Sequence, residues 1–231
     1  MNNPFEIISQ RKAARIAGIG ILIRLIVGPF VFFLLDTLFG DSMFVVPGDA
    51  AIVAAKKIKV NAWLLCVFIA SISTLVMCDV VVVLALFIVL KPVNKDLAMF
   101  AVFFRLMGAF IFVISMVFLF IEPLLFTNVF LIGQIIGAFH MLVFGYLIVK
   151  SGYIPRILGI LLIIGGALGY FMESFTYFFF PDYVWISSPG IIVAVLIEVL
   201  LCIWLLWKGN KIPEMKPEVE YIKKNKENRY K

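Results

Sequence analysis

Six ionisable side chains interrupt long apolar stretches of this sequence, and they are the residues whose types could do chemistry. They are Arg24, Asp79, Arg105, His140, Glu173 and Glu198. An isolated charge in hydrocarbon is costly, so such residues indicate either a working site or an ion network that specifies how helices pack. His140 or Glu198 could serve as a general base, and a histidine can change its charge between about pH 5 and 8. The six residues form a candidate intramembrane polar core.

The positions of these residues predict that most of them share one layer near mid-membrane. The layer consists of Arg24, Asp79, Arg105, His140 and Glu198, whereas Glu173 lies nearer the outer side. At 1.5 Å per helical residue, about 8 to 11 residues from the helix ends correspond to a depth of about 12 to 17 Å. The charges of the two acids and the two arginines cancel when His140 is neutral, which favours ion pairs between these side chains. We expect Asp79 to pair with Arg105, since they flank the Lys91–Asp96 turn symmetrically, and Glu198 to be the acidic partner of His140.

Small residues near the charges predict that most of these side chains face neighbouring helices. The glycines expected at such helix contacts are Gly20, Gly28, Gly133, Gly137, Gly165 and Gly169. Small residues at four-residue spacing mark faces where helices approach closely. Arg105 and Glu198 have alanine or cysteine at the same spacing, whereas Asp79 has Leu75 and Val83. The charges are therefore expected to point into a helical bundle and not into lipid.

The composition excludes an ordinary soluble domain. The 231 residues are 64% hydrophobic and 15% charged, with a mean hydropathy of +1.12. Soluble domains have about 45 to 50% apolar and about 25% charged residues. The net charge of +6 comes from Lys and Arg in loops and in the tail. These clusters indicate membrane topology and not nucleic-acid binding.

Metal, cofactor and disulfide chemistry is not expected. The sequence has one histidine and lacks the HExxH pattern that zinc hydrolases use. Cys66, Cys78 and Cys202 lie far apart within apolar runs, so we interpret them as small apolar side chains. A nucleophile is also not evident, because Ser115 lies some ten residues further out than Arg105.

The apolar runs predict an all-α integral membrane bundle of six transmembrane helices, because about 20 apolar residues cover the hydrocarbon core. The expected helices span residues 16–39, 62–90, 97–120, 128–149, 155–180 and 189–207. Pro123 is expected to stop the third helix, and residues 49–59 could form a short interfacial helix. Residues 1–209 are assigned to a single six-helix domain. Residues 210–231 form a basic tail that is expected to be disordered or to lie on anionic lipid headgroups.

The charges of the loops predict the orientation of the bundle. The N-terminus, the Lys91–Asp96 turn, the Lys150–Arg156 turn and the tail are basic, and the loops at Glu122 and Asp182 are acidic. Positive loops stay in the cytoplasm, so both termini are expected there, in a bacterial cytoplasmic membrane. The lysines of the 40–60 loop are the one exception to this rule.

Several short motifs, taken in order and spacing, resemble a known family. They are Lys12–Gly18, the Phe104-Arg105 pair, Ser151–Gly159, and Glu198 ahead of Trp204–Gly209. Between about Arg11 and Gly209 the chain resembles a bacterial membrane protein family catalogued as domain of unknown function 4386. The resemblance implies a six-helix integral membrane protein and no established activity. Family members often have a glutamate three residues after the arginine of the third helix, where this chain has Gly108.

The sequence is compatible with three different functions. The polar core of a non-enzymatic membrane protein could bind or move a small solute, a proton or an amphiphile, although no helix is visibly broken at mid-depth as in many transporters. An intramembrane enzyme acting on lipid could use His140 or Glu198 as a general base. A structural or partner-binding protein would need only the small-residue faces and the basic tail. The partners expected are the bilayer, anionic headgroups and a small solute or lipid ligand, with no nucleic acid.

Overall fold

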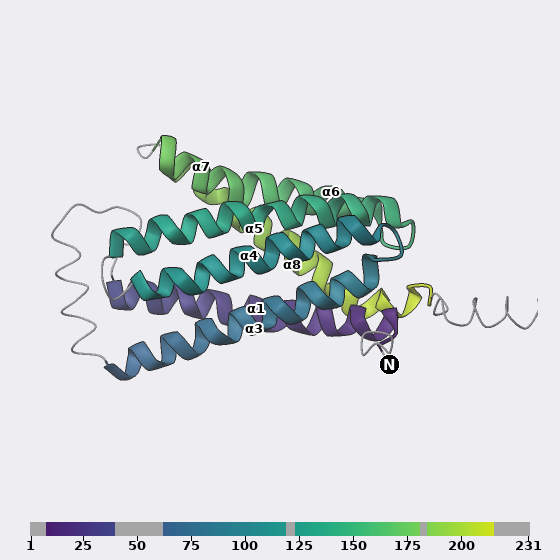
Figure 1. Cartoon of the computed structure of the whole chain (residues 1–231), viewed down its shortest axis with the longest axis horizontal. Helices are drawn as coiled ribbons and strands as arrows, with labels where there is room; N and C mark the ends of the chain where they lie inside the picture. The colour runs from purple at the N-terminus through teal and green to yellow at the C-terminus, as the bar shows by residue number, and fades with distance from the viewer. Residues whose placement is uncertain (1–7, 40–61, 119–122, 181–183, 215–231) are drawn as a thin grey trace, which may run out of the picture.

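The computed structural model describes residues 8–39, 62–118, 123–180 and 184–214. The regular structure in these ranges is helical throughout (Figure 1). The elements are α1 (Gln10–Phe39), α3 (Ala62–Leu90), α4 (Lys95–Phe118), α5 (Pro123–Ser151), α6 (Arg156–Gly165), η3 (Gly166–Phe171), α7 (Met172–Phe179), α8 (Val184–Lys208) and η5 (Gly209–Lys211). Within the described residues, six helices are long and apolar enough to cross a membrane. The chain is an all-α, six-helix membrane bundle.

Four helices begin earlier than the sequence predicts, among them α4 at Lys95 instead of residue 97 and α8 at Val184 instead of residue 189. Helix α1 begins at Gln10 instead of residue 16, because Ser9 precedes it and accepts a bond at its carbonyl from the Ala13 N–H, at 2.9 Å. Helix α5 begins at Pro123 instead of residue 128. A proline is favoured in the first helical turn, where its missing N–H has no intrahelical partner to lose. The proline that we expected to stop one helix therefore starts the next. The interfacial helix expected at 49–59 lies outside the described residues.

We expected no helix to be broken at mid-depth, and the fifth span departs from this in part, because its α-helix changes to π-helical turns without ending. The fifth span is α-helical in α6 and α7, but η3 between them is a π-helix. Pro29 lies inside α1 and Pro189 lies inside α8. A proline cannot donate the bond to the carbonyl four residues earlier, and π-helical turns occur often at functional sites. The fifth span therefore departs from regular α-helix at η3, whereas α1 and α8 continue as α-helices through their prolines.

Both described ends of the chain and the two basic turns lie at one end of the bundle, at the right of Figure 1. We call this the termini end, and it comprises residues 8–14, 91–94, 152–155 and 209–214. The opposite end is called the loop end. Each pair of consecutive spans therefore runs antiparallel, as the charge pattern predicts. Which end faces the cytoplasm stays a prediction.

The structure explains why the turn between α5 and α6 has the sequence Ser-Gly-Tyr-Ile. Gly152 has a φ of 72°, in the left-handed region that favours glycine. The Ser151 hydroxyl accepts a bond from the Ile154 N–H at 3.3 Å. The Tyr153 hydroxyl donates to the Val89 carbonyl at 2.6 Å, and burial raises the pKa of Tyr153 to about 12. The turn is therefore tied to the end of α3.

Two separate hydrophobic clusters hold the bundle together. The cluster near the termini end includes Val89, Leu147 and Leu205, all fully buried. The cluster near the loop end consists of Val31, Leu34, Phe68, Ile72 and Phe126. Members of the two clusters lie in most of the long helices, so each cluster ties several spans together. The region between the clusters contains the charged residues.

Packing continues beyond the expected domain boundary at residue 209. Ile212 is fully buried in the cluster at the termini end. Its carbonyl accepts a bond from the Arg11 Nε at 3.0 Å. The first residues of the expected tail therefore belong to the folded domain, because they cover the start of α1. Residues 215–231 lie outside the described residues.

Glycines allow close approach at several helix crossings. A β-carbon placed at Gly20 would lie 2.6 Å from Val82 Cγ2, and one at Gly169 would lie 2.6 Å from Ala194 Cβ. The other expected glycines at contacts are Gly133 against Gly108, Gly137 against Arg105, and Gly165 against Ala194. Gly28 is different, since no atom of the described residues comes within 4 Å of a β-carbon there. The expectation of a helix contact at Gly28 is wrong, because it lines a cavity.

Candidate functional site

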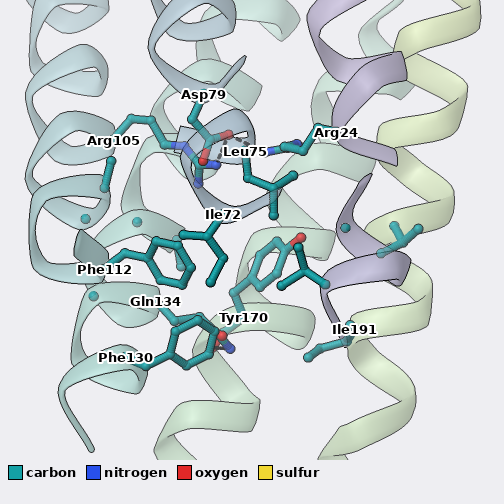
Figure 2. Close-up of a pocket in the computed structure, with 18 of the residues that line it drawn as sticks. Arg24, Ile72, Leu75, Asp79, Arg105, Phe112, Phe130, Gln134, Tyr170 and Ile191 are labelled. Atoms are coloured by element: carbon teal, nitrogen blue, oxygen red, sulfur yellow. Dashed lines mark hydrogen bonds and ion pairs between the residues drawn. The ribbon is translucent and has the colours of Figure 1, made fainter. Parts of the chain in front are cut away.

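Four charged side chains from four helices form one ion network, here called the charge network. Arg24 of α1 pairs through Nη1 with Asp79 Oδ1 of α3, at 3.0 Å, and through Nη2 with Glu198 Oε2 of α8. Arg105 of α4 pairs through Nη2 with the same Asp79 oxygen. Figure 2 shows Asp79 between the two arginines. The expected pair of Asp79 and Arg105 is present, and Asp79 is also the acceptor that both arginines share.

The charge network is mostly buried and extends to a fifth span. The exposed fractions of its side chains range from 5% at Glu198 to 19% at Arg105. The Tyr170 hydroxyl of η3 donates to Glu198 Oε1 at 3.3 Å. Burial of paired charges with hydrogen bonds fixes helices in one arrangement, although it contributes little net stability. The network therefore specifies how α1, α3, α4, η3 and α8 meet.

His140 is not placed as the sequence predicts. Its Nδ1 contacts the Gly137 carbonyl of its own helix, and its ring packs edge-on against Phe144 with the centroids 6.0 Å apart. Glu198 pairs instead with Arg24 and accepts from Tyr170. The expected pairing of His140 with Glu198 is wrong, because α5 packs mainly against α4 and α6 and not against α8.

Glu173 takes part in a second polar contact nearer the loop end. Its Oε2 accepts a bond from Gln134 Nε2 at 2.7 Å, and the same nitrogen donates to the Tyr170 carbonyl at 3.2 Å. Sequence reasoning missed both Gln134 and Tyr170. Each follows a glycine of the small-residue faces, Gly133 or Gly169, and this is the signal that could have found them.

A cavity of about 520 Å³ lies beside the charge network, toward the loop end. The charge network and Tyr170 form its polar end, and Gln134 lies further along the wall (Figure 2). Its apolar lining includes Ile72, Leu75, Phe112, Phe130, Ile191 and Val195. Small-molecule sites in proteins typically measure about 300 to 1,000 Å³ and combine apolar walls with a few polar groups. The cavity has the size and the chemistry of such a site.

Helices α1 and α8 both line the cavity. Near the termini end these helices are in close contact, since a β-carbon at Gly18 would lie 2.8 Å from Leu206 Cδ2. Ten residues further along α1, Gly28 has open space beside it within the described part of the chain. The next residue, Pro29, both lines the cavity and is exposed at the surface. The two helices are therefore in contact near the termini end, and at Pro29 a residue of the cavity wall is exposed at the surface of the bundle.

Gly108 is required by the crossing of α4 and α5. A β-carbon there would lie 2.9 Å from the Gly133 carbonyl oxygen and 3.1 Å from the Gly137 Cα. Backbone atoms cannot move aside as a flexible side chain can, so a glutamate at this position would push the two helices apart. Since Gly108, Gly133 and Gly137 all line the cavity, this crossing also forms part of its wall.

The geometry offers limited support for catalysis or metal binding. Among the described residues, no group of three or more His, Cys, Asp or Glu side chains could hold a metal ion. The Ser115 hydroxyl donates to the Phe112 carbonyl at 2.6 Å, within its own helix. The acids of the charge network are engaged by arginines.

Comparisons with known proteins match one family model over most of the chain. The family described as domain of unknown function (DUF4386) matches residues 16–125 and 124–209. An uncharacterised protein from Archaeoglobus fulgidus is 30% identical over 157 residues, which cover 64% of this chain and 86% of the relative. No solved structure matches the chain. Neither description names an activity.

Proposed function

We propose that this chain, which belongs to the family described as domain of unknown function (DUF4386), is a multi-pass membrane protein that binds a small amphiphile within the bilayer. The observation that carries the proposal is the cavity with the charge network at one end and apolar walls along its length. A fully polar solute would leave these walls without apolar contacts, and a fully apolar ligand would desolvate the charges without replacing their hydrogen bonds. A molecule with one polar and one apolar end matches both parts.

The opening between α1 and α8 supports an amphiphile over a water-soluble solute or a proton. The hydrophobic clusters pack on both sides of the cavity along the bundle. We place the opening of the cavity at Gly28 and Pro29, because both residues line it and Pro29 is exposed on the side of the bundle, where a transmembrane protein contacts lipid. A molecule dissolved in the membrane could reach the cavity by this route.

Orientation is part of the proposal, with both termini in the cytoplasm of a cell whose cytoplasmic membrane holds the protein. In a variant lacking the three native cysteines, Asn94→Cys and Asp182→Cys are expected to react with a membrane-impermeant maleimide from opposite sides. Intact cells should label Asp182→Cys, and only opened cells should label Asn94→Cys, because basic turns stay inside. Labelling of both positions from one side would contradict the six-span orientation.

The binding proposal is tested by filling the cavity from Gly28. Gly28→Leu should reduce occupancy by about tenfold, since the added side chain has space only in the cavity or its opening. The probe is a long-chain monoacylglycerol that carries a diazirine in its chain, incorporated into nanodiscs with the purified protein. Mass spectrometry of the cross-linked peptides reports labelling of Ile191 and Val195, which line the cavity.

The matched control is Ala70→Leu, which adds similar bulk at an exposed position of α3. It should leave labelling of the cavity unchanged. Lipid-facing Ile192, which is 64% exposed, gives the background labelling from bulk lipid. If a monoacylglycerol, a fatty acid and an alkylammonium probe all label Ile191 and Val195 no more than Ile192, the cavity does not bind an amphiphile.

A further inference from the structure

We infer that the ligand of this cavity is a single-chain amphiphile with an uncharged headgroup that offers oxygen acceptors, and that it enters from the bilayer between α1 and α8. The inference rests on the proposed function and specifies its ligand. It follows from four properties of the site: its charge balance, its hydrogen-bonding capacity, its volume and the position of its opening.

The charge balance favours an uncharged headgroup. Arg24 and Arg105 face two acids, Asp79 and Glu198, within one set of ion pairs. A charged headgroup would leave one unbalanced charge in a region of low dielectric, which costs several kcal/mol unless a counter-charge comes with it. An uncharged headgroup leaves the balance intact.

The charge network contains more hydrogen-bond donors than acceptor sites. Each guanidinium carries about five N–H donors, and each carboxylate offers about four acceptor sites. The Tyr170 hydroxyl adds a further donor to this set. Among the described residues, no buried side-chain nitrogen or oxygen lacks a hydrogen-bond partner. Arg24 and Arg105 both line the cavity, so N–H groups that the two acids do not engage can meet a ligand there.

A ligand that meets these groups must supply acceptors. Hydroxyl and ester oxygens accept hydrogen bonds from a guanidinium and carry no charge. Arg105 is the best placed donor, because within the described ranges it pairs with one acid, Asp79, whereas Arg24 engages two acids. Its Nη1 lies 3.7 Å from a β-carbon position at Gly137, beside the cavity wall. The headgroup is therefore assigned to Arg105.

The volume and the walls set the size and course of the chain. About 520 Å³ accommodates a headgroup and part of one alkyl chain, but a two-chain phospholipid is far larger. The rings of Phe112 and Phe130, with centroids 5.3 Å apart, bound the apolar part of the cavity. The remainder of a long chain can pass through the opening at Pro29 into lipid. A ligand bound in the cavity can therefore keep the rest of its chain in the membrane.

The experiment compares three diazirine probes with the same long alkyl chain in nanodiscs at pH 8. The probes carry a glycerol ester, a carboxylate or a trimethylammonium headgroup. The intact chain should give about tenfold more labelling of Ile191 and Val195 with the glycerol ester than with either charged probe. Free glycerol, which has the headgroup without the chain, should not compete, whereas an unlabelled monoacylglycerol in the nanodisc should.

Two substitutions should shift this preference in opposite directions. Arg105→Gln leaves the network with one surplus negative charge and should favour the ammonium probe. Asp79→Asn leaves one surplus positive charge and should favour the carboxylate probe. Arg156→Gln removes an exposed positive charge outside the cavity and should leave the ranking unchanged. Each preference is a ratio between probes on the folded protein, so a lower yield of a variant does not affect it.

The outcomes separate the inference from the proposed function. Equal labelling by the three probes in the intact chain, abolished by Gly28→Leu, would overturn the headgroup assignment and keep amphiphile binding. A preference for the carboxylate or the ammonium probe in the intact chain would also overturn it. Competition by free glycerol would show that the ligand comes from water. Labelling no higher than at Ile192 with every probe would reject both proposals.

Discussion

Asp79→Asn should destabilise the protein more than removal of any other single charge of the network. Asp79 is the acceptor shared by Arg24 and Arg105, so its neutralisation leaves two arginines with one remaining acid, Glu198. Removing one partner of a buried ion pair costs about 3 to 5 kcal/mol, because the remaining charge is left uncompensated. The measurement is the free energy of unfolding of the detergent-solubilised protein, obtained by titration with a denaturing detergent.

Asp96→Asn is the matched control for this substitution. Asp96 is an exposed acid in the first turn of α4, so its neutralisation should change stability by well under 1 kcal/mol. In the double variant Asp79→Asn, Arg105→Gln, the loss should be smaller than the sum of the single losses, since both members of one pair are removed together. Additive losses would show that the pair is not coupled.

Gly145→Leu should prevent close packing of α5 and α6 and reduce the yield of folded protein. A β-carbon at Gly145 would lie 2.6 Å from the Gly159 carbonyl oxygen and 3.1 Å from the Ile163 amide nitrogen. The reciprocal contact is as close, with a β-carbon at Gly159 lying 2.5 Å from the Gly145 carbonyl oxygen. Overpacking typically costs about 1 to 3 kcal/mol, and a clash with backbone on both helices should reach or exceed the upper value.

The comparison for Gly145→Leu is the same substitution at Gly28, also within a transmembrane helix. Gly28 has no neighbour within 4 Å among the described residues, so the leucine causes no such clash. Its higher helix propensity should even add up to about 1 kcal/mol. Unfolding measured as above should therefore separate the two variants by several kcal/mol. Equal stability would mean that α5 and α6 do not cross at Gly145 and Gly159.

The sequence by itself determined the six-helix architecture. In lipid every backbone N–H and C=O must form a hydrogen bond within the protein. An apolar run of about 20 residues that crosses the membrane therefore folds as a helix. The limits of α3, predicted at residues 62–90, agree with the structure because the polar residues Asn61 and Lys91 adjoin the apolar run. The Asp79 and Arg105 pair was also predictable, since α3 and α4 are joined by a short turn that aligns residues at equal distances from it.

Only the tertiary structure decided the partners of the remaining charges. Counting residues gives a depth along a helix but neither its rotation nor its neighbour. Glu198 therefore lies at the depth of His140 and yet pairs with Arg24, because α8 packs against α1 and not mainly against α5. The roles of Tyr170 and Gln134 depend in the same way on the π-helical segment, which no periodicity of apolar residues reveals.

The cavity is likewise a property of the assembled bundle. The glycines at positions 20 and 28 look equivalent in the sequence, four residues either side of Arg24. One packs against Val82 of α3, whereas the other lines the cavity and has no neighbour within 4 Å among the described residues. Whether a small residue fills a contact or leaves a space depends on the distance between helices, and that distance is set by the packing of all six spans together.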